Sequence, residues 1–287
     1  MERGLLDRSE RGKLALTGAD RKAFLNGQVT NDVEALEPGQ GLYAAFLTPK
    51  GKMLGDLRVL DAGDELLLDT ERVALQALFD ILRRASIGHD VELHKRTLQR
   101  GLLSLIGEPA DGPEHSHRED TVAGRPVRRI VTDRGADVLC DSEDTEAVRA
   151  ALLAEGFDEV DEAAAEVLRV ESGRPRYGVD LDDSVIPQEA GLNDRAVSFT
   201  KGCYVGQETV ARLFYRGKPN RHLRGIRLPA PAAAGTPLTL DGKEVGRVSS
   251  PVVSPRLGPV ALALVRREAP PGTTLDDGSA VVELPFA

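Results

Sequence analysis

Segment 201–208, Lys-Gly-Cys-Tyr-Val-Gly-Gln-Glu, combines a cysteine, a lysine and two glycines within eight residues. Glycine permits close approach of the backbone to another group, or a positive φ angle. The segment leads into an expected helix, so Cys203 would face the unpaired N–H groups of a helix N-terminus, which favour a thiolate. Lys201 would act in the same direction. Cys203 is therefore either a reactive thiolate, suited to redox chemistry, an adduct or a metal, or a small buried apolar residue.

Other reactive residue types lack a partner at useful spacing. His115 and His117 form an H-x-H pair inside the polar stretch 108–120, which we interpret as a solvated loop with an adventitious metal contact as the alternative. Cys140 ends an expected strand without positive neighbours, which indicates a buried, inert thiol. No glycine-rich nucleotide motif, HExxH, CxxC or GxSxG occurs, and this argues against nucleotide, metallohydrolase and serine-hydrolase sites.

The elements that position these residues follow from hydrophobic periodicity. In the N-terminal two-thirds the expected strands are 13–17, 42–48, 53–61, 65–69, 101–106, 127–132 and 137–140. The expected helices are 20–29, 70–82 and 145–155, with Asp20 and Thr70 as N-caps of the first two. Hairpin-like strands with helices interspersed predict an α+β fold with antiparallel sheets and argue against a doubly wound sheet.

From Leu223 onward the sequence pattern changes to short runs rich in β-forming residues, separated by Pro and Gly turns. The Asp-Gly pairs at 241–242 and 277–278 are strong hairpin signals. We expect a small C-terminal β-barrel here. The predicted domains are therefore 1–217, made of two α+β lobes, and 218–287, the barrel.

Composition limits the class of protein. The 287 residues are 41% hydrophobic and 29% charged, which suits a globular chain. A net charge of −9 and 4% aromatic residues disfavour unspecific binding to nucleic acid or anionic membrane. No stretch reaches the roughly 18 apolar residues of a membrane helix, and 1–10 has no signal-peptide core. We expect a cytoplasmic protein with no membrane partner, whose two cysteines stay reduced.

Four ordered segments resemble a known family. Segment 201–208, followed by Val-Ala-Arg at 210–212, is similar to the signature of the YgfZ-type folate-binding proteins, relatives of the glycine-cleavage T-protein (aminomethyltransferase). Segments 24–33, 168–180 and 186–192 resemble further parts of this family. The resemblance implies a three-lobed ring, built from two mixed α/β lobes and the barrel. It also implies bound tetrahydrofolate, or a derivative such as 5-formyltetrahydrofolate, in a central hole.

The resemblance also implies site residues. Glu189 would accept paired hydrogen bonds from the pterin edge, with a surface glutamate as the alternative. Asp56 would act at the folate N10 region as an acid or base, or would fix orientation. It falls where the T-protein has two aspartates, but Gly55 replaces the first, which argues against T-protein catalysis. The remaining folate-binding residues would be Tyr177, Asn31, Lys201, Gly202, Tyr204, Gly206, Gln207, Glu208 and Arg212.

A basic segment overlaps the signature. Between 201 and 227 the chain carries seven Lys or Arg residues and a single acidic residue, Glu208. Such a patch favours an anion: a polyglutamylated folate tail, a phosphate backbone or an acidic partner protein. A solvated helix face and linker is the alternative.

Three functional hypotheses follow. The leading one is a tetrahydrofolate-binding accessory protein that supports synthesis or repair of iron–sulfur enzymes, including tRNA-modifying ones, with Cys203 as the functional thiol. A single thiolate supplies one of the four ligands usual for a cluster, which argues against cluster storage. The alternative is a folate-dependent aminomethyltransferase or demethylase that uses Asp56. The third is direct tRNA binding through the basic segment.

Overall fold

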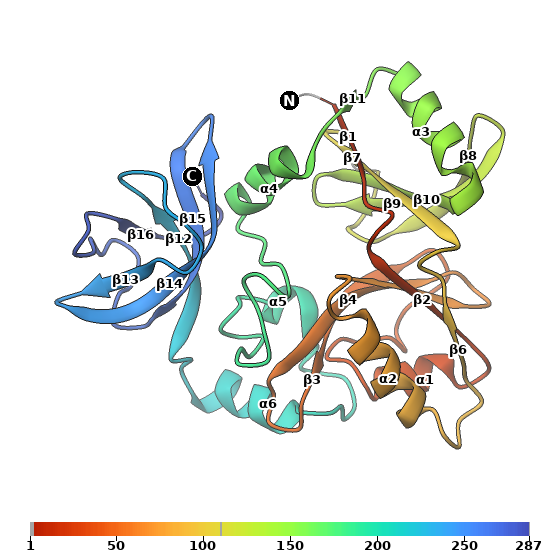
Figure 1. The fold of residues 1–287 in the computed structure, drawn as a ribbon. Helices are drawn as coiled ribbons and strands as arrows, with labels where there is room; N and C mark the ends of the chain where they lie inside the picture. The colour runs from red at the N-terminus through yellow and green to blue at the C-terminus, as the bar shows by residue number, and fades with distance from the viewer. Residues whose placement is uncertain (1–2, 110, 287) are drawn as a thin grey trace. The chain divides into compact units, whose positions relative to one another are not determined.

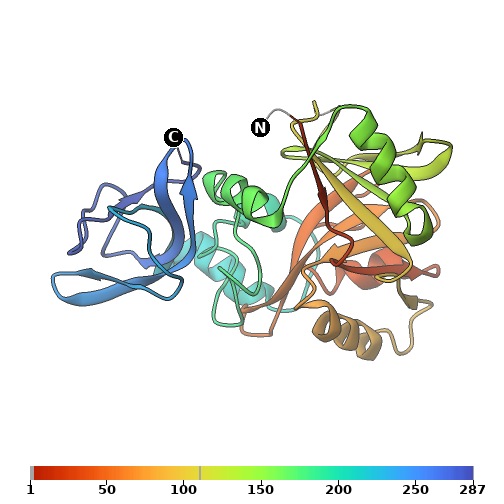
Figure 2. The same cartoon turned by 45° about the horizontal axis from the view of Figure 1, so that its top comes forward.

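The structure is a computed structural model that describes residues 3–109 and 111–286. The chain forms two compact units. The first unit comprises Met1–Leu47, Leu54–Asp161 and Arg195–Val205, and the second comprises Thr48–Met53, Glu162–Asp194 and Gly206–Ala287. Figure 1 shows the elements of both units, and Figure 2 shows them after a rotation.

One sheet of the first unit has the strand order β3-β4-β5-β2-β6. Its strands are β2 (Gly12–Thr17), β3 (Gly41–Leu47), β4 (Met53–Asp61), β5 (Leu66–Thr70) and β6 (Glu92–Lys95). The short helix α1 (Arg21–Asn26) follows β2, and α2 (Leu75–Ala85) follows β5. Leu75, Leu78 and Leu82 of α2 recur at helical spacing and are buried.

The other sheet of the first unit has the order β11-β1-β7-β10-β9-β8. Its strands are β1 (Gly4–Asp7), β7 (Arg100–Ile106), β8 (His117–Val122), β9 (Arg125–Thr132), β10 (Gly135–Asp141) and β11 (Asp158–Glu159). A 3₁₀ turn, η1 (Ser142–Asp144), precedes α3 (Thr145–Ala154), whose Val148 and Leu152 are buried. A buried cluster that includes Leu60 of β4 and Ile130 of β9 joins the two sheets.

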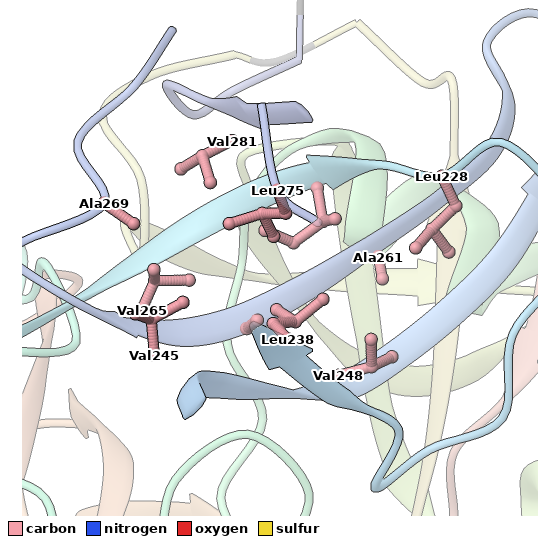
Figure 3. Packing of buried hydrophobic residues seen from close by; sticks show 11 residues of the cluster. Leu228, Leu238, Val245, Val248, Ala261, Val265, Ala269, Leu275 and Val281 are labelled. Carbon is pink, nitrogen blue, oxygen red and sulfur yellow. The ribbon is translucent and has the colours of Figure 1, made fainter. Parts of the chain in front are cut away.

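The second unit contains a curled antiparallel sheet, drawn in blue in Figure 1, with the order β13-β14-β15-β12-β16. Its strands are β12 (Arg221–Arg227), β13 (Pro237–Leu240), β14 (Lys243–Ser254), β15 (Gly258–Arg266) and β16 (Ala280–Val282). Leu238, Val245 and Val265 contribute to the buried cluster on one face of this sheet (Figure 3). Helices α4 (Glu162–Glu171) and α6 (Gln207–Arg216) precede the sheet, and the chain changes units within α5 (Asn193–Ala196).

The predicted mixture of helices with antiparallel sheets is confirmed, whereas the three-lobed ring stays a prediction. Two local expectations are wrong. Thr70 does not cap α2, because it still belongs to β5 and its hydroxyl donates to the backbone oxygen of Asp56 (2.5 Å). The stretch 108–120 is not loop throughout, because β8 begins at His117 and pairs with β9. No helix within the described ranges is long and apolar enough to cross a membrane.

Candidate functional site

A carboxylate and a phenol form the most distinctive titratable pair of the first unit. Asp56 of β4 is 5% exposed, and its Oδ2 accepts a hydrogen bond from the hydroxyl of Tyr43 on β3 (2.5 Å). Burial raises the pKa of Asp56 to about 6, although the bond from Tyr43 acts to lower it. Burial and the charge of Asp56 raise the pKa of Tyr43 well above its ordinary value, so the phenol remains the donor. The pair can therefore take up or release a proton near neutral pH.

Strand alternation decides which residues of β4 share the face of Asp56. Asp56, Arg58 and Leu60 point to one side, and the residues between them point to the other. A Cβ atom placed on Gly55 would lie 3.1 Å from the Cβ of Ala74, at the start of α2. An aspartate at position 55 would thus face α2 and would not join Asp56 beside Tyr43.

A buried ionic network supports β4 next to Asp56. Arg58 donates to Asp69 of β5 (2.5 Å) and to Asp137 of β10 (2.7 Å). Burial acts to raise the pKa of Asp69, but the guanidinium groups of Arg58 and Arg11 lower it to about 2. Because Asp69 remains ionised, the network joins the two sheets over a wide pH range and holds β4 in place.

Arg195 and Asn31 surround Tyr43. The guanidinium of Arg195 lies 5.5 Å from the centre of the Tyr43 ring and forms an ion pair with Glu114. The amide nitrogen of Asn31 donates to the backbone oxygens of Tyr43 (2.9 Å) and Arg195 (3.3 Å). Asn31, predicted to bind folate, therefore uses its amide protons to fasten the backbone around Tyr43.

The two histidines of the polar stretch are packed against the protein. Burial, together with nearby Arg58, lowers the pKa of His115 to about 4, so the imidazole is neutral at pH 7. The Nδ1 atom of His117 accepts from Arg128 (2.9 Å), because arginine only donates. Its Nε2–H then donates to the backbone oxygen of Gln40 (3.2 Å). These two partners give His117 a structural role that the H-x-H spacing does not show.

The signature segment is anchored by Lys201 and Tyr204. The Nζ atom of Lys201 donates to the backbone oxygens of Asn26 (2.5 Å), Val29 (2.8 Å) and Asn31 (2.9 Å). Burial lowers the pKa of Lys201 to about 8. The same cause raises the pKa of Tyr204 to about 12. Lys201 thus holds the loop that carries Asn31, and its role in folate binding stays a prediction.

Cys203 lies in the exposed part of this segment, next to exposed Gly202. The sequence predicted it at a helix N-terminus, which is wrong. Helix α6 begins at Gln207, after Gly206 with a left-handed φ of 84°. Because a right-handed helix excludes this conformation, α6 does not extend back beyond Gly206, and Cys203 precedes its first residue, Gln207, by four positions. The alternative of a small buried apolar residue is also wrong, since the thiol is exposed.

The remaining signature residues belong to the second unit, because the units divide between Val205 and Gly206. Gln207 is half-buried on α6, and Glu208 and Arg212 are exposed on the same helix. A Cβ atom on Gly51 would lie 2.8 Å from the Cβ of Thr209, so the predicted turn at 49–51 packs closely on α6.

Glu189 is 5% exposed, so the alternative of a surface glutamate is wrong. Its carboxylate accepts from the Nε (3.2 Å) and Nη2 (3.1 Å) atoms of Arg221 and from the backbone N–H of Ile186 (3.2 Å). Its backbone oxygen accepts from the N–H of Leu223 in β12 (2.7 Å). Glu189 therefore fastens its loop to β12, and a carboxylate offers about four acceptor positions in all.

Segment 168–180 forms a buried clamp. Arg169 of α4 donates to Asp180 (2.7 Å) and to Ser250 of β14 (2.6 Å). The Asp180 side chain is fully buried and also accepts from the backbone N–H of Arg176 (2.9 Å). Tyr177, predicted to bind folate, is half-buried in the same turn and pairs with Leu181. Arg169 and Asp180 of this segment thus have buried structural partners.

Sequence reasoning missed Tyr43, Arg195 and the Arg169–Asp180 pair. Tyr43 and Asp56 lie 13 residues apart on neighbouring strands. Their pairing depends on strand register, and no spacing in the sequence marks it. For Arg169, an arginine within the apolar spacing of a helix was the available signal.

Comparison with known proteins agrees with this fold. Residues 2–112 match the family described as GCVT N-terminal domain. A chloroplastic putative transferase of Arabidopsis thaliana is 30% identical over 264 residues, covering 86% of this chain and 61% of that protein. An aminomethyltransferase of Nostoc sp. (strain PCC 7120 / SAG 25.82 / UTEX 2576) is 29% identical over 294 residues, covering 91% and 76% respectively.

The fold matches a solved structure over its full length. The glycine cleavage system aminomethyltransferase T from Bartonella henselae superposes with a TM-score of 0.88 at 24% identity, covering 100% of this chain and 86% of that one. This likeness shows the fold. The chain spans 61% of the length of the Arabidopsis relative. The membership of the YgfZ branch and the cytoplasmic location stay predictions.

Proposed function

We propose that the chain is a GcvT-like protein that binds a tetrahydrofolate, and that Asp56 donates or accepts a proton during transfer of the one-carbon group. The match of residues 2–112 to the GCVT N-terminal domain and the similarity to an aminomethyltransferase support this proposal. The carrying observation is the buried Asp56–Tyr43 pair, with the pKa of Asp56 raised to about 6. At pH 7 roughly a tenth of such a carboxyl is protonated, and the two forms interconvert readily. General acid–base catalysis works best with a pKa near the working pH.

The residues fit a folate in part. Glu189 already accepts three hydrogen bonds, so about one acceptor position remains for a pterin donor, where the sequence predicted a paired contact. The side-chain N–H groups of Asn31 and Lys201 already donate hydrogen bonds to backbone oxygens. Arg212 is exposed on α6, so its guanidinium is accessible to the anionic glutamate tail of a folate. Tetrahydrofolate would supply the nitrogens that accept the one-carbon unit. Which derivative binds, tetrahydrofolate itself or 5-formyltetrahydrofolate, is tested by titration with both.

The second candidate function is a folate-binding accessory protein that supports iron–sulfur enzymes, with Cys203 as the functional thiol. The observation that favours it is the exposure of Cys203 between two buried anchors, Lys201 and Tyr204. A single thiolate suits exchange with a client protein better than storage of a cluster. Clients that modify tRNA, and direct tRNA binding through segment 201–227, belong to this second candidate.

Calorimetric titration with tetrahydrofolate and 5-formyltetrahydrofolate tests the shared premise. We expect saturable binding, weakened about tenfold in Glu189→Gln, because the neutral amide loses a charge-assisted contact with the pterin. Circular dichroism of the variant checks that the loop held by Arg221 remains folded. Absence of binding by either folate to the wild-type protein would remove the premise.

Turnover with an aminomethyl donor and tetrahydrofolate separates the two uses. In one-carbon transfer, Asp56→Asn should lower turnover at least about a hundredfold. Asp64→Asn removes an exposed carboxylate of the same unit and should leave turnover unchanged. Turnover that survives Asp56→Asn would overturn the role of Asp56. Folate binding without turnover, joined to loss of client-enzyme activity in Cys203→Ala, would favour the accessory function.

A further inference from the structure

The turn that precedes β8 packs against the start of β3, although these strands belong to different sheets of the first unit. The backbone N–H of His115 donates to the backbone oxygen of Val131 in β9 (2.8 Å). A Cβ atom on Gly41, the first residue of β3, would lie 2.7 Å from the backbone oxygen of His115. His115 has a φ of 71°, which residues other than glycine rarely adopt. This close packing fixes the turn and thereby the place of its neighbour, Glu114.

Glu114 forms an ion pair with Arg195, whose guanidinium lies 5.5 Å from the centre of the Tyr43 ring. The two charged side chains are only 32% and 26% exposed, so solvent screens their charges in part. Burial raises the pKa of Tyr43, and the charge of Arg195 acts against this rise. The Tyr43 hydroxyl donates to Asp56 (2.5 Å). Because a more acidic donor favours the ionised form of its acceptor, the charge of Arg195 acts on Asp56 through the phenol.

Other charged groups near Asp56 are compensated among themselves. Burial raises the pKa of Asp56, Glu71 adds to this rise, and Arg11 opposes it. Arg11 and Glu71 form an ion pair with each other. Arg58, on the same face of β4, is held by two carboxylates. Burial lowers the pKa of His115 to about 4, so its imidazole does not titrate near neutral pH. Substitutions in the ion pair beside the phenol leave all these groups in place.

We propose that Arg195 and Glu114 are positioning residues that act in opposite directions on how tightly the Asp56–Tyr43 pair holds its proton. Arg195 directs a positive charge at the phenol and favours the ionised carboxylate. Glu114 offsets part of this charge and keeps the protonated carboxyl accessible near neutral pH. The chemical purpose of this balance rests on the proposed function, because a group that both takes up and releases a proton works best with a pKa near the working pH.

A pH titration of the Asp56 carboxyl by carbon NMR on the full chain tests the pair without any ligand. The signal of Asp56 is assigned by its absence in Asp56→Asn. We expect Glu114→Gln to lower the pKa of Asp56 by about half a unit and Arg195→Gln to raise it by about the same amount. The double variant should return close to the wild-type value. Arg195→Lys keeps the positive charge and should also titrate like the wild type.

Glu119→Gln is the matched control, because Glu119 also forms an ion pair with an arginine of this unit, Arg128. It should leave the pKa of Asp56 unchanged. An unmoved pKa in Glu114→Gln, shifts in the same direction for both single variants, or an equal shift in the control would overturn the inference. If circular dichroism shows that Arg195→Gln does not fold, Glu114→Gln and Arg195→Lys decide the question by the same criteria.

Aminomethyl turnover as a function of pH separates this inference from the proposed function. The limb of the profile that Asp56 controls should move in the same direction as the NMR pKa in each variant. Opposite NMR shifts with no turnover, or with a profile that stays fixed, would keep the pair and remove the proton role of Asp56. Turnover that is lost in Asp56→Asn, together with an Asp56 pKa that neither single variant moves, would keep the proposed function and overturn the pair.

Discussion

Asp56→Asn should stabilise the protein at neutral pH, although Asp56 carries the proposed chemistry. Burial raises the pKa of Asp56 from its ordinary 3.8 to about 6. At about 1.4 kcal/mol for each pKa unit, ionised Asp56 destabilises the folded state by about 3 kcal/mol. The folded pKa is the higher one, so the stability contributed by protonated Asp56 is present below pH 3.8 and is lost as the pH rises through about 6. Asparagine carries no such penalty and keeps an oxygen for the bond from Tyr43.

Urea unfolding of wild type and Asp56→Asn between pH 4 and pH 8 measures this difference. The gain in unfolding free energy should be near zero at the acidic end and grow to about 3 kcal/mol above pH 7. Asp64→Asn, at an exposed position of the same unit, should show no pH-dependent gain. Parallel curves for wild type and Asp56→Asn across this range would refute the reasoning, since they would mean that the carboxylate loses no solvation on folding.

Three further predictions concern the residues that hold the site. Tyr43→Phe removes the hydrogen bond that acts to lower the pKa of Asp56, so this pKa should rise above 6, as followed by carbon NMR of the carboxyl; an unchanged pKa would contradict the pairing. Lys201→Met leaves three backbone oxygens without their donor and should lower the unfolding free energy by about 2–4 kcal/mol in urea unfolding, whereas no loss would assign the lysine to the surface. Arg169→Leu leaves Asp180 buried without its cation and should lower the unfolding free energy by about 3–5 kcal/mol. The double variant Arg169→Leu with Asp180→Asn should recover part of this free energy, and no recovery would argue against a direct pair.

Local sequence signals located most of the elements. Strand β4 has the predicted limits, 53 and 61, because a run of alternating apolar residues begins after a Pro-Lys-Gly turn. The Asp-Gly pair at 241–242 forms the predicted turn between β13 and β14, and both residues have a positive φ. Thr70 failed as a cap because its hydroxyl found a backbone oxygen of a neighbouring strand, a partner that local rules do not consider.

The candidate site was less predictable than the fold. Asp56 was selected by family resemblance, but its pKa is raised by burial, and the hydrogen bond from Tyr43 that acts against this rise depends on strand register. Lys201 was expected beside an anion, and the structure turns it inward to three backbone oxygens of the loop at 26–31. The carboxylate of Glu189 was expected to bind a ligand, and in the structure it forms an ion pair with Arg221. In each case the sequence marked the residue as unusual, and only the structure shows which group it contacts.

The sequence by itself determined which segments become strands, helices and turns, and which reactive side chains they carry. These properties depend on periodicity and on turn residues within a few positions of one another. Only the tertiary structure decided which polar groups meet, such as Lys201 with a backbone oxygen 170 residues earlier. The physical reason is that hydrogen bonds and charge interactions act over a few ångströms of space, and burial strengthens them. Distance along the chain says little about either quantity until the sheets are paired and packed.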